Sequence, residues 1–153
     1  MTVGKTADNN IRSAMERYQS RIPHYVPFEY IEIPDLKRGG NKITEAAQKE
    51  AECKIMLSKI TPGDRVILMD ERGREYTSRQ FAEQIDNALI SLPRNMIFII
   101  GGPYGFSPEM YSRADSMIAL SKMTLTHEMA RLFLIEQIYR GCTILRGEPY
   151  HHD

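Results

Sequence analysis

Two short loops of small residues, each placed directly after an apolar run, constrain the fold of this chain more than any other feature. The run from Met96 to Ile100 leads into Gly101-Gly102-Pro103-Tyr104-Gly105. A second run, Met117 to Leu120, leads into Ser121-Lys122-Met123-Thr124-Leu125. Apolar runs of this length suit strands buried within a sheet, and open α/β sheets bind ligands at the carboxyl ends of such strands. We therefore expect both loops to line one ligand site.

Helix and strand patterns alternate along the chain. Apolar residues at helical spacing, bounded by capping residues and prolines, predict helices at residues 9–22, 44–59, 77–92, from 107 onward and at 126–140. Apolar or alternating runs predict strands at residues 1–3, 28–33, 66–69, 96–100 and 117–120. This order predicts a single domain over residues 1–153, built as a three-layer α/β/α sandwich with a mostly parallel sheet.

Several local signals refine this prediction. Thr77 with Gln80 forms a capping-box signature, and Phe81, Ile85 and Leu89 are expected to form the buried stripe of the helix that follows. Residues 70–73 (Asp-Glu-Arg-Gly) are expected to form the turn after the strand at 66–69.

The helix expected at residues 126–140 is apolar around nearly its whole circumference. Its apolar residues are Met129, Ala130, Leu132, Phe133, Leu134, Ile135 and Ile138. Such a helix does not lie on a wet surface, so it needs a cover on both sides. In a domain of 153 residues the sheet covers one side, and we predict that a second subunit covers the other in a homodimer.

Composition limits the cellular setting and the partners. The two cysteines, Cys53 and Cys142, have no metal-like spacing and are expected to be reduced thiols in the cytoplasm. No apolar stretch approaches the length of a membrane span, and the first residues lack the apolar core of a signal peptide. The net charge is zero, which counts mildly against nucleic acid as a partner.

Basic residues are nevertheless clustered. Lys37, Arg38 and Lys42 surround a Gly-Gly turn, and Arg131, Arg140 and Arg146 punctuate the last part of the chain. Surface solvation is the ordinary explanation for any one of them. A dimer would double each cluster on a shared face, which is one way for a neutral chain to bind RNA.

Taken singly, the candidate site motifs leave alternatives open. The loop at 101–105 matches neither the dinucleotide fingerprint nor the phosphate loop, so it is either a tight turn or backbone exposed to a flat ligand. His127 is more often structural than catalytic in such a position. His151 and His152 also suit a mobile terminus or the remnant of a tag. No zinc spacing or hydrolase triad is evident, so we expect no metal.

Four segments in the last third, taken together and in order, resemble one known family. They are Ile99 to Gly105, Leu120 to His127, the stretch from Arg131 to Arg140 that contains Glu-Gln-Ile-Tyr-Arg, and Arg146 to His151. Weaker likeness extends upstream through Val3-Gly4, Glu32-Ile33-Pro34 and residues 49–52. The family is the ribosomal RNA large-subunit methyltransferase H family of the SPOUT superfamily, and the resemblance covers essentially the whole chain.

This resemblance implies a fold that general topology rules would reject, because true knots are almost absent from proteins. SPOUT proteins thread the C-terminal segment through a loop, so a C-terminal deep trefoil knot is implied, with S-adenosylmethionine held in its loops. By position, the cofactor contacts of the family fall on Met69, Gly101, Leu120, Ser121, Lys122, Met123, Thr124 and Leu125. Gly102 and Gly105, with Gly101, would give the adenosyl group close access to the backbone.

The implied reaction is methylation of N3 of a pseudouridine in 23S rRNA of the assembled ribosome. The nitrogen must lose its proton and lie in line with the methyl carbon and sulfur. We expect Arg140 to stabilise the anion or hold a phosphate, Tyr150 to stack on the base, and His151 to accept the proton. His127, Arg131 and Arg146 are expected to contact the substrate.

Two other functions compete with this one. A nucleotide-binding α/β oxidoreductase is disfavoured by the missing dinucleotide fingerprint. A non-catalytic ribosome-associated module of the same fold is disfavoured by the presence of Arg140, Tyr150 and His151.

Overall fold

The structure is a computed structural model that describes residues 1–36, 43–91 and 94–151. Lys37, Arg38, Lys42, Pro93 and His152 therefore lie outside the described residues, as do the expectations that concern them.

A five-stranded sheet forms the middle layer. In spatial order its strands are β2 (Glu32–Ile33), β1 (Thr2–Val3), β4 (Met96–Ile100), β3 (Arg65–Arg74) and β5 (Ser116–Ile118). Every pairing between these strands is parallel. The carboxyl ends of β3, β4 and β5 therefore meet at one edge of the sheet, as the two loops had led us to expect.

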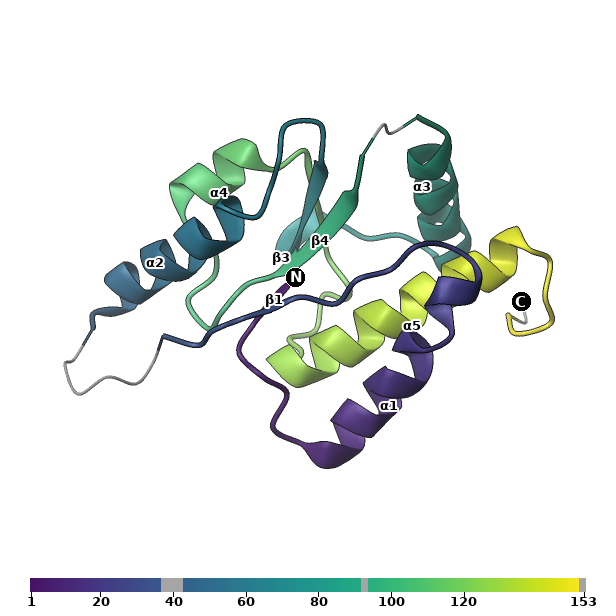
Figure 1. Cartoon of the computed structure of the whole chain (residues 1–153), viewed down its shortest axis with the longest axis horizontal. Coiled ribbons are helices and arrows are strands. Elements are labelled where there is room, and N and C mark those ends of the chain that lie inside the picture. Colours follow the sequence, from purple (N-terminus) through teal and green to yellow (C-terminus); the bar gives the residue numbers. More distant parts are fainter. Residues whose placement is uncertain (37–42, 92–93, 152–153) are drawn as a thin grey trace.

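Helices cover both faces of this sheet (Figure 1). They are α1 (Asn9–Gln19), α2 (Glu45–Leu57), α3 (Ser78–Ser91), α4 (Pro108–Arg113) and α5 (His127–Leu145), with a short 3-10 turn at Ile22–His24. One buried cluster joins Ile67, Ile100 and Ile118 of the sheet to α1, α3 and α5. A second cluster joins the opposite face to α2 and α4. The predicted three-layer α/β/α sandwich is confirmed.

Side-chain caps account for most helix starts. Asp8, Thr44, Ser107 and Thr126 each accept a hydrogen bond from a backbone N–H in the first turn of their helix. The predicted capping box before α3 is present in both directions: the Thr77 N–H donates to Gln80 Oε1 at 3.0 Å, and the Gln80 N–H donates to Thr77 Oγ1 at 3.2 Å.

Two strand predictions were wrong in extent. The strand expected at residues 28–33 is reduced to Glu32–Ile33, because only these residues pair with β1. Residues 70–73 are not a turn; β3 continues through them to Arg74. The extension exists because β5 pairs with it across an irregularity, in which Ile118 faces both Met69 and Arg74. Pairing with a distant segment, rather than local composition, decides this strand.

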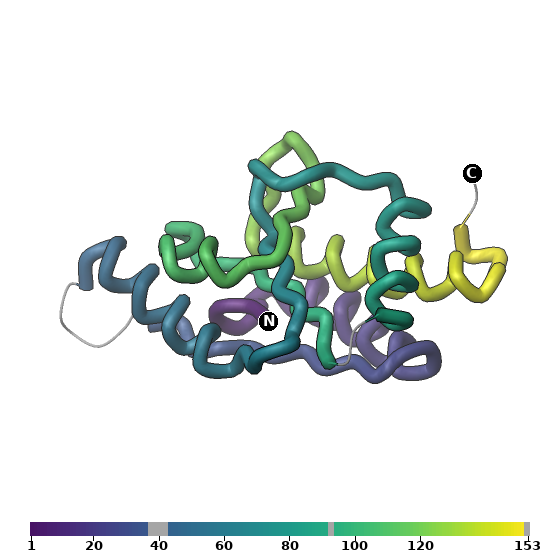
Figure 2. The backbone as a smooth tube through the Cα atoms, turned by 90° about the horizontal axis from the view of Figure 1, so that it is seen from above, coloured from purple at the N-terminus to yellow at the C-terminus, as the bar shows by residue number. Residues whose placement is uncertain are grey.

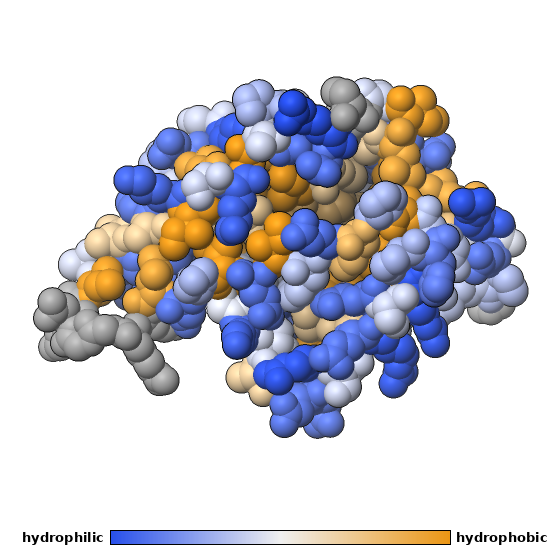
Figure 3. Space-filling model, viewed as in Figure 1, coloured by the Kyte–Doolittle hydropathy of each residue, from blue (hydrophilic) through white to orange (hydrophobic). Residues whose placement is uncertain are grey.

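Two helix predictions also need correction. Leu89 was expected in the buried stripe of α3, but it is 55% exposed, and Ala82 and Ala88 are buried beside Phe81 and Ile85 instead. Small residues on that face let α3 pack closely on α5, and Figure 3 shows apolar surface over the exposed side of α3. The last helix does not end at Arg140 but continues to Leu145.

The two ends of the crossover between β3 and β5 lie very close together. The Ala119 N–H donates to the Arg74 carbonyl oxygen at 3.1 Å. A Cβ atom on Gly73 would lie 2.5 Å from the backbone nitrogen of Ile118. Glycine is therefore required where the chain leaving β5 passes the extension of β3, and both segments are visible in Figure 2.

Candidate functional site

A crevice of about 590 Å³ lies at the carboxyl ends of β3, β4 and β5. The predicted cofactor residues that line it are Met69, Gly101, Gly102, Gly105, Leu120, Ser121, Met123, Thr124 and Leu125. His127 and Ala130, in the first turn of α5, close one side. The structure thus brings together two loops that are separated by 15 residues in the sequence, because their strands end at the same edge of the sheet.

Lys122 behaves differently from its neighbours in the second loop. Its side chain is 88% exposed and its Nζ lies 3.8 Å from Glu75 Oε2, outside the lining of the crevice. Met123 lines the crevice while 79% of it is exposed, an unusual exposure for a large apolar side chain. The Met123 N–H donates to Ser121 Oγ at 2.9 Å, which holds the bend.

The glycine-rich loop is shaped by the protein around it. The Gly105 N–H donates to the Gly102 carbonyl oxygen at 3.1 Å, and Gly105 has a φ of +73°, in the left-handed region. From α2, the buried carboxylate of Glu52 packs directly against Gly102, where a Cβ atom would collide with Glu52 Oε2. Gln48 Nε2 donates to Glu52 Oε1 at 2.7 Å. The loop is therefore both a tight turn and exposed backbone at the crevice.

One wall of the crevice consists of residues that were not predicted from the sequence. It is formed by Asp70 and Arg72 of the β3 extension and by Tyr111 of α4. Tyr111 Oη donates to Asp70 Oδ2 at 2.6 Å, and Arg72 Nε donates to Asp70 Oδ1 at 3.0 Å. The Arg72 guanidinium lies 4.7 Å from the centre of the Tyr111 ring. The sequence signal that could have indicated this wall is the charged pair Asp70 and Arg72, which follows a buried strand directly.

The protonation states of the side chains in this wall follow from their contacts. Hydrogen bonds from Arg72, supported by Tyr111, lower the pKa of Asp70 to about 2. Burial, together with the hydrogen bond to Asp70, raises the pKa of Tyr111 to about 12. At neutral pH the wall therefore carries an ionised carboxylate, a guanidinium and a neutral phenol.

The residues predicted to be catalytic form a second cluster at the far end of α5. Arg140 is bonded to Glu136 one turn earlier, and its guanidinium lies 4.8 Å from the centre of the Tyr150 ring. Its Nη1 lies 3.3 Å from Nδ1 of His151. Tyr150 Oη donates to Glu136 Oε1 at 3.1 Å. Burial, with hydrogen bonds to Tyr18 and Glu136, raises the pKa of Tyr150.

This cluster and the crevice lie apart in the chain. Arg140 follows His127 by thirteen residues along α5, which corresponds to about 20 Å at the rise of an α-helix. Figure 1 shows α5 running from the sheet edge to the C-terminus. The structure therefore brings Arg140, Tyr150 and His151 together with one another, but not with the residues predicted to bind the cofactor.

The three residues predicted to contact the substrate lie in different environments. His127 lines the crevice and Arg146 is exposed at the end of α5. Arg131 is only 5% exposed, and its guanidinium donates to the carbonyl oxygens of Val3 and Gly4 and to Thr6 Oγ1. These bonds tie α5 to the carboxyl end of β1, so we assign Arg131 to the fold rather than to a substrate surface.

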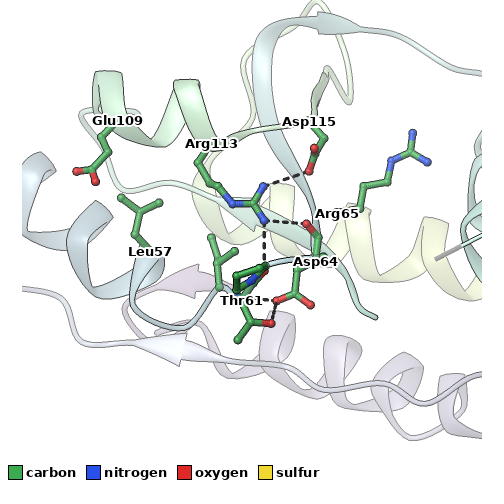
Figure 4. A pocket seen from close by; sticks show the side chains of 10 residues that line it. Leu57, Thr61, Asp64, Arg65, Glu109, Arg113 and Asp115 are labelled. Atoms are coloured by element: carbon green, nitrogen blue, oxygen red, sulfur yellow. Dashed lines mark hydrogen bonds and ion pairs between the residues drawn. The ribbon is translucent and has the colours of Figure 1, made fainter. Parts of the chain in front are cut away.

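A second hollow, of about 730 Å³, lies at the opposite, amino end of the sheet (Figure 4). Several of its polar groups bond to one another or to nearby backbone. Arg113 Nη2 donates to the Asp64 carbonyl oxygen at 2.8 Å, and Arg113 Nη1 lies 3.3 Å from Asp115 Oδ2. Burial acts to raise the pKa of Asp64, but hydrogen bonds from Thr61 and Asn95 outweigh it and hold the pKa at about 2. We therefore assign these groups to the stability of the fold rather than to ligand binding.

Within residues 1–36, 43–91 and 94–151, no group of three or more His, Cys, Asp or Glu side chains is arranged to hold a metal ion. No helix in the same ranges has the length and apolar character needed to cross a membrane. Both cysteines are buried and free, and burial raises the pKa of the Cys142 thiol to about 11.

Comparison with known proteins agrees with this geometry. A protein named ribosomal RNA large subunit methyltransferase H from Cytophaga hutchinsonii is 48% identical over 99% of this chain and 96% of its own length. Proteins of the same name from Parabacteroides distasonis and Christiangramia forsetii are 46% and 47% identical, over 100% and 98% of this chain and 97% and 95% of their own lengths. The family model described as "Predicted SPOUT methyltransferase" matches residues 1–151. The crevice at the carboxyl edge of the sheet thus lies in a chain that belongs to the SPOUT methyltransferase family.

Proposed function

We propose that this protein is an S-adenosylmethionine-dependent methyltransferase of large-subunit ribosomal RNA. We further propose, from the family resemblance, that it methylates N3 of a pseudouridine in 23S rRNA of the assembled ribosome. The observation that carries the proposal is the meeting of the 101–105 and 120–125 loops in one crevice. The names of the relatives support the ribosomal substrate.

The crevice fits a methyl donor of this type. Its volume of about 590 Å³ is in the range of sites for small organic cofactors. Leu120, Met123 and Leu125 offer apolar surface for adenine and ribose, and the backbone at Gly101 and Gly105 is open to polar contacts. S-adenosylmethionine, when bound, supplies the sulfonium methyl group. The chain's own task is to hold that group in line with the target nitrogen and to exclude water.

Arg140, Tyr150 and His151 at the end of α5, here called the tail cluster, offer the groups that methylation of the target nitrogen requires. His151 is a candidate proton acceptor for the imide N3–H, because a neutral imidazole has a ring nitrogen that can take up a proton. Arg140 can stabilise the anion that results, and its contact with Glu136 raises its pKa further above neutrality. Tyr150 is held against Tyr139 with ring centres 4.9 Å apart, which leaves a rigid aromatic group for stacking.

A homodimer could bring the tail cluster of one subunit close to the crevice of the other, although the two lie apart within a single chain. Met129 and Phe133 are exposed on α5, and they lie on the same face of the helix as Glu136 and Arg140. Two copies of this face packed in opposite directions would bury the apolar residues. They would also bring the tail of each subunit toward the crevice of the other. We therefore propose a two-fold dimer in which each site is formed by both subunits.

We also propose that the C-terminal part of the chain forms a trefoil knot. The chain would enter this knot where Ile118 passes Gly73.

Three measurements test the proposed function. Calorimetry is expected to detect binding of S-adenosylmethionine and none of NAD. Transfer of tritiated methyl groups to ribosomes is expected for the unaltered protein. His151→Ala should lose turnover while keeping cofactor affinity, because His151 is proposed to take the proton from the target base and not to contact the methyl donor. Methyl transfer at the unaltered rate by this variant would remove His151 from the mechanism.

The shared site has its own test. Light scattering is expected to return the mass of a dimer at micromolar concentration, and a monomer would refute the dimer. Mixing an inactive crevice variant with the inactive His151→Ala variant should restore activity, since mixed dimers would contain one intact site. No restoration, despite proven subunit exchange, would place each site within one chain.

A further inference from the structure

The wall of the crevice contains a cation that neither the family resemblance nor the relatives assign to the reaction. Among the described residues that line the crevice, Arg72 carries the only full positive charge. Asp70 and Glu71 beside it carry negative charge, and His127 stands on the opposite side in the first turn of α5. A strand of RNA is a polyanion, so its phosphates meet Arg72 as the one attractive group on this wall.

Arg72 is also held in a defined position. Its Nε donates to Asp70 Oδ1 at 3.0 Å and its Nη2 to Asp70 Oδ2 at 3.2 Å. Its planar guanidinium stacks on Tyr111. Tyr111 is fixed in turn by its hydrogen bond to Asp70 and by an edge-on contact with Phe106, with ring centres 5.8 Å apart. Little further ordering is needed when a ligand binds such a side chain.

One edge of the guanidinium remains open. The Arg72 side chain is 62% exposed although it makes three contacts with Asp70 and Tyr111. Asp70 engages Nε and Nη2 of the guanidinium, which leaves Nη1 outside this ion pair. An anionic oxygen approaching Nη1 from the solvent side avoids the carboxylate of Asp70 and gains a charge-assisted hydrogen bond.

We propose that Arg72 binds a backbone phosphate of the RNA at the mouth of the crevice and so positions the target nucleotide over the methyl donor. This inference rests on the proposed function and names a substrate contact within that site. The carboxylate of the methyl donor presents a similar anionic group, and the experiment separates the two sources.

The test compares Arg72→Gln with the unaltered protein. Methyl transfer to ribosomes is measured as kcat/KM at several salt concentrations, and S-adenosylmethionine affinity is measured by calorimetry. Arg72→Gln should lower kcat/KM on the order of tenfold, the effect of one charge-assisted hydrogen bond. The slope of log affinity for an RNA fragment against log salt should fall by about 0.7, the value for one phosphate contact on a single strand. Cofactor affinity should be unchanged.

Two further variants sharpen the test. Arg65→Gln changes an arginine on the same strand, β3, at the opposite end of the sheet, and should leave the RNA salt dependence and kcat/KM unchanged. Arg72→Lys keeps the charge without the planar fork, so its kcat/KM should lie between those of Arg72→Gln and the unaltered protein.

The outcomes are distinguishable. Equal RNA affinity and equal salt slope for Arg72→Gln and the unaltered protein would overturn the proposal. So would a matching loss of cofactor affinity, which would assign Arg72 to the carboxylate of the methyl donor. If the unaltered protein transfers no methyl group to ribosomes, the proposed function fails, and RNA affinity alone then decides the role of Arg72.

Discussion

The two hollows at opposite ends of the sheet differ in how their polar groups are satisfied. In the amino-end hollow, Arg113, Asp64, Asp115 and Thr61 bond to one another or to nearby backbone (Figure 4). In the carboxyl-end crevice, glycine backbone and an exposed methionine face outward, and the guanidinium of Arg72 keeps one edge open. The two hollows are of comparable volume, about 730 Å³ and about 590 Å³.

This difference indicates that the volume of a hollow does not by itself identify a binding site. Groups whose hydrogen-bonding capacity is used within the fold have little left to offer a ligand, and their removal harms the fold. Arg72 differs because 62% of its side chain stays exposed beside its contacts with Asp70. Apolar side chains left in water, beside accessible backbone, become more favourable only when something covers them. Variants in the amino-end hollow should therefore change stability, and variants in the crevice should change binding.

The largest effect is expected where the crevice depends on the chain crossing. Gly73→Ala would place a methyl group 2.5 Å from the Ile118 backbone nitrogen, so either β3 or β5 must move. We expect a loss of about 3 kcal/mol of unfolding free energy in urea titrations, together with weakened cofactor binding. Gly105→Ala meets no atom within 4 Å and should cost only about 1 kcal/mol, from its positive φ. Equal stability of the two variants would contradict the tight crossing.

The second effect concerns the amino-end hollow alone. Arg113→Ala removes the hydrogen bond to the Asp64 carbonyl oxygen and the contact with Asp115. A loss of about 1–2 kcal/mol in chemical unfolding is expected. The dissociation constant for S-adenosylmethionine should stay unchanged in calorimetry. A variant of normal stability with weakened cofactor binding would reverse the roles assigned to the two hollows.

A smaller effect is expected for Met123→Ala in the crevice. This side chain is exposed, so its loss should leave the melting temperature unchanged, whereas cofactor affinity should fall by about 1 kcal/mol, or fivefold. Met56→Ala is the matched control. Met56 is buried in α2, and its truncation should cost about 2–5 kcal/mol of stability. Thermal melts and calorimetry on both variants separate exposed apolar surface kept for a ligand from apolar surface kept for the core.

The smallest effect is a change in pH dependence. The pKa of Asp64 is about 2 in the folded protein against 3.8 for the free group, so its ionised form stabilises the fold above pH 4. That contribution disappears as the pH falls from about 4 toward 2. Asp64→Asn should therefore be less stable at neutral pH and show a shallower loss of stability between pH 4 and 2. Acid titrations followed by circular dichroism measure both, and an unchanged slope would show that Asp64 is not held in its ionised form.

Much of the fold and half of the site were predictable because local signals and tertiary structure agree. The caps at Thr44, Ser107 and Thr126 and the capping box at Thr77 start their helices as predicted, since the first-turn N–H groups need partners in any context. The run Met96–Ile100 forms β4 with the predicted bounds. Strand alternation then required the 101–105 and 120–125 loops to meet, because parallel strands end at one edge.

Other features depended on contacts between distant residues. The strand extension at residues 70–74 exists only because β5 lies beside it, and this extension carries Asp70 and Arg72 to the crevice. Arg131 was expected to contact the substrate, yet it is buried, because its guanidinium donates to the carbonyl oxygens of Val3 and Gly4. Leu89 is exposed because alanines, not leucine, face α5.

The amino-acid sequence determined the helix starts, the buried strands and the chemistry of the loops, because each of these follows from neighbouring residues. Only the tertiary structure decided which residues share a surface. It joined Asp70, Arg72 and Tyr111 across 41 residues, and it left Arg140, Tyr150 and His151 at the far end of α5 from the crevice. The meeting of the two loops follows from the order of strands and helices, but these other contacts arise from strand pairing and helix packing that no local pattern in the chain encodes.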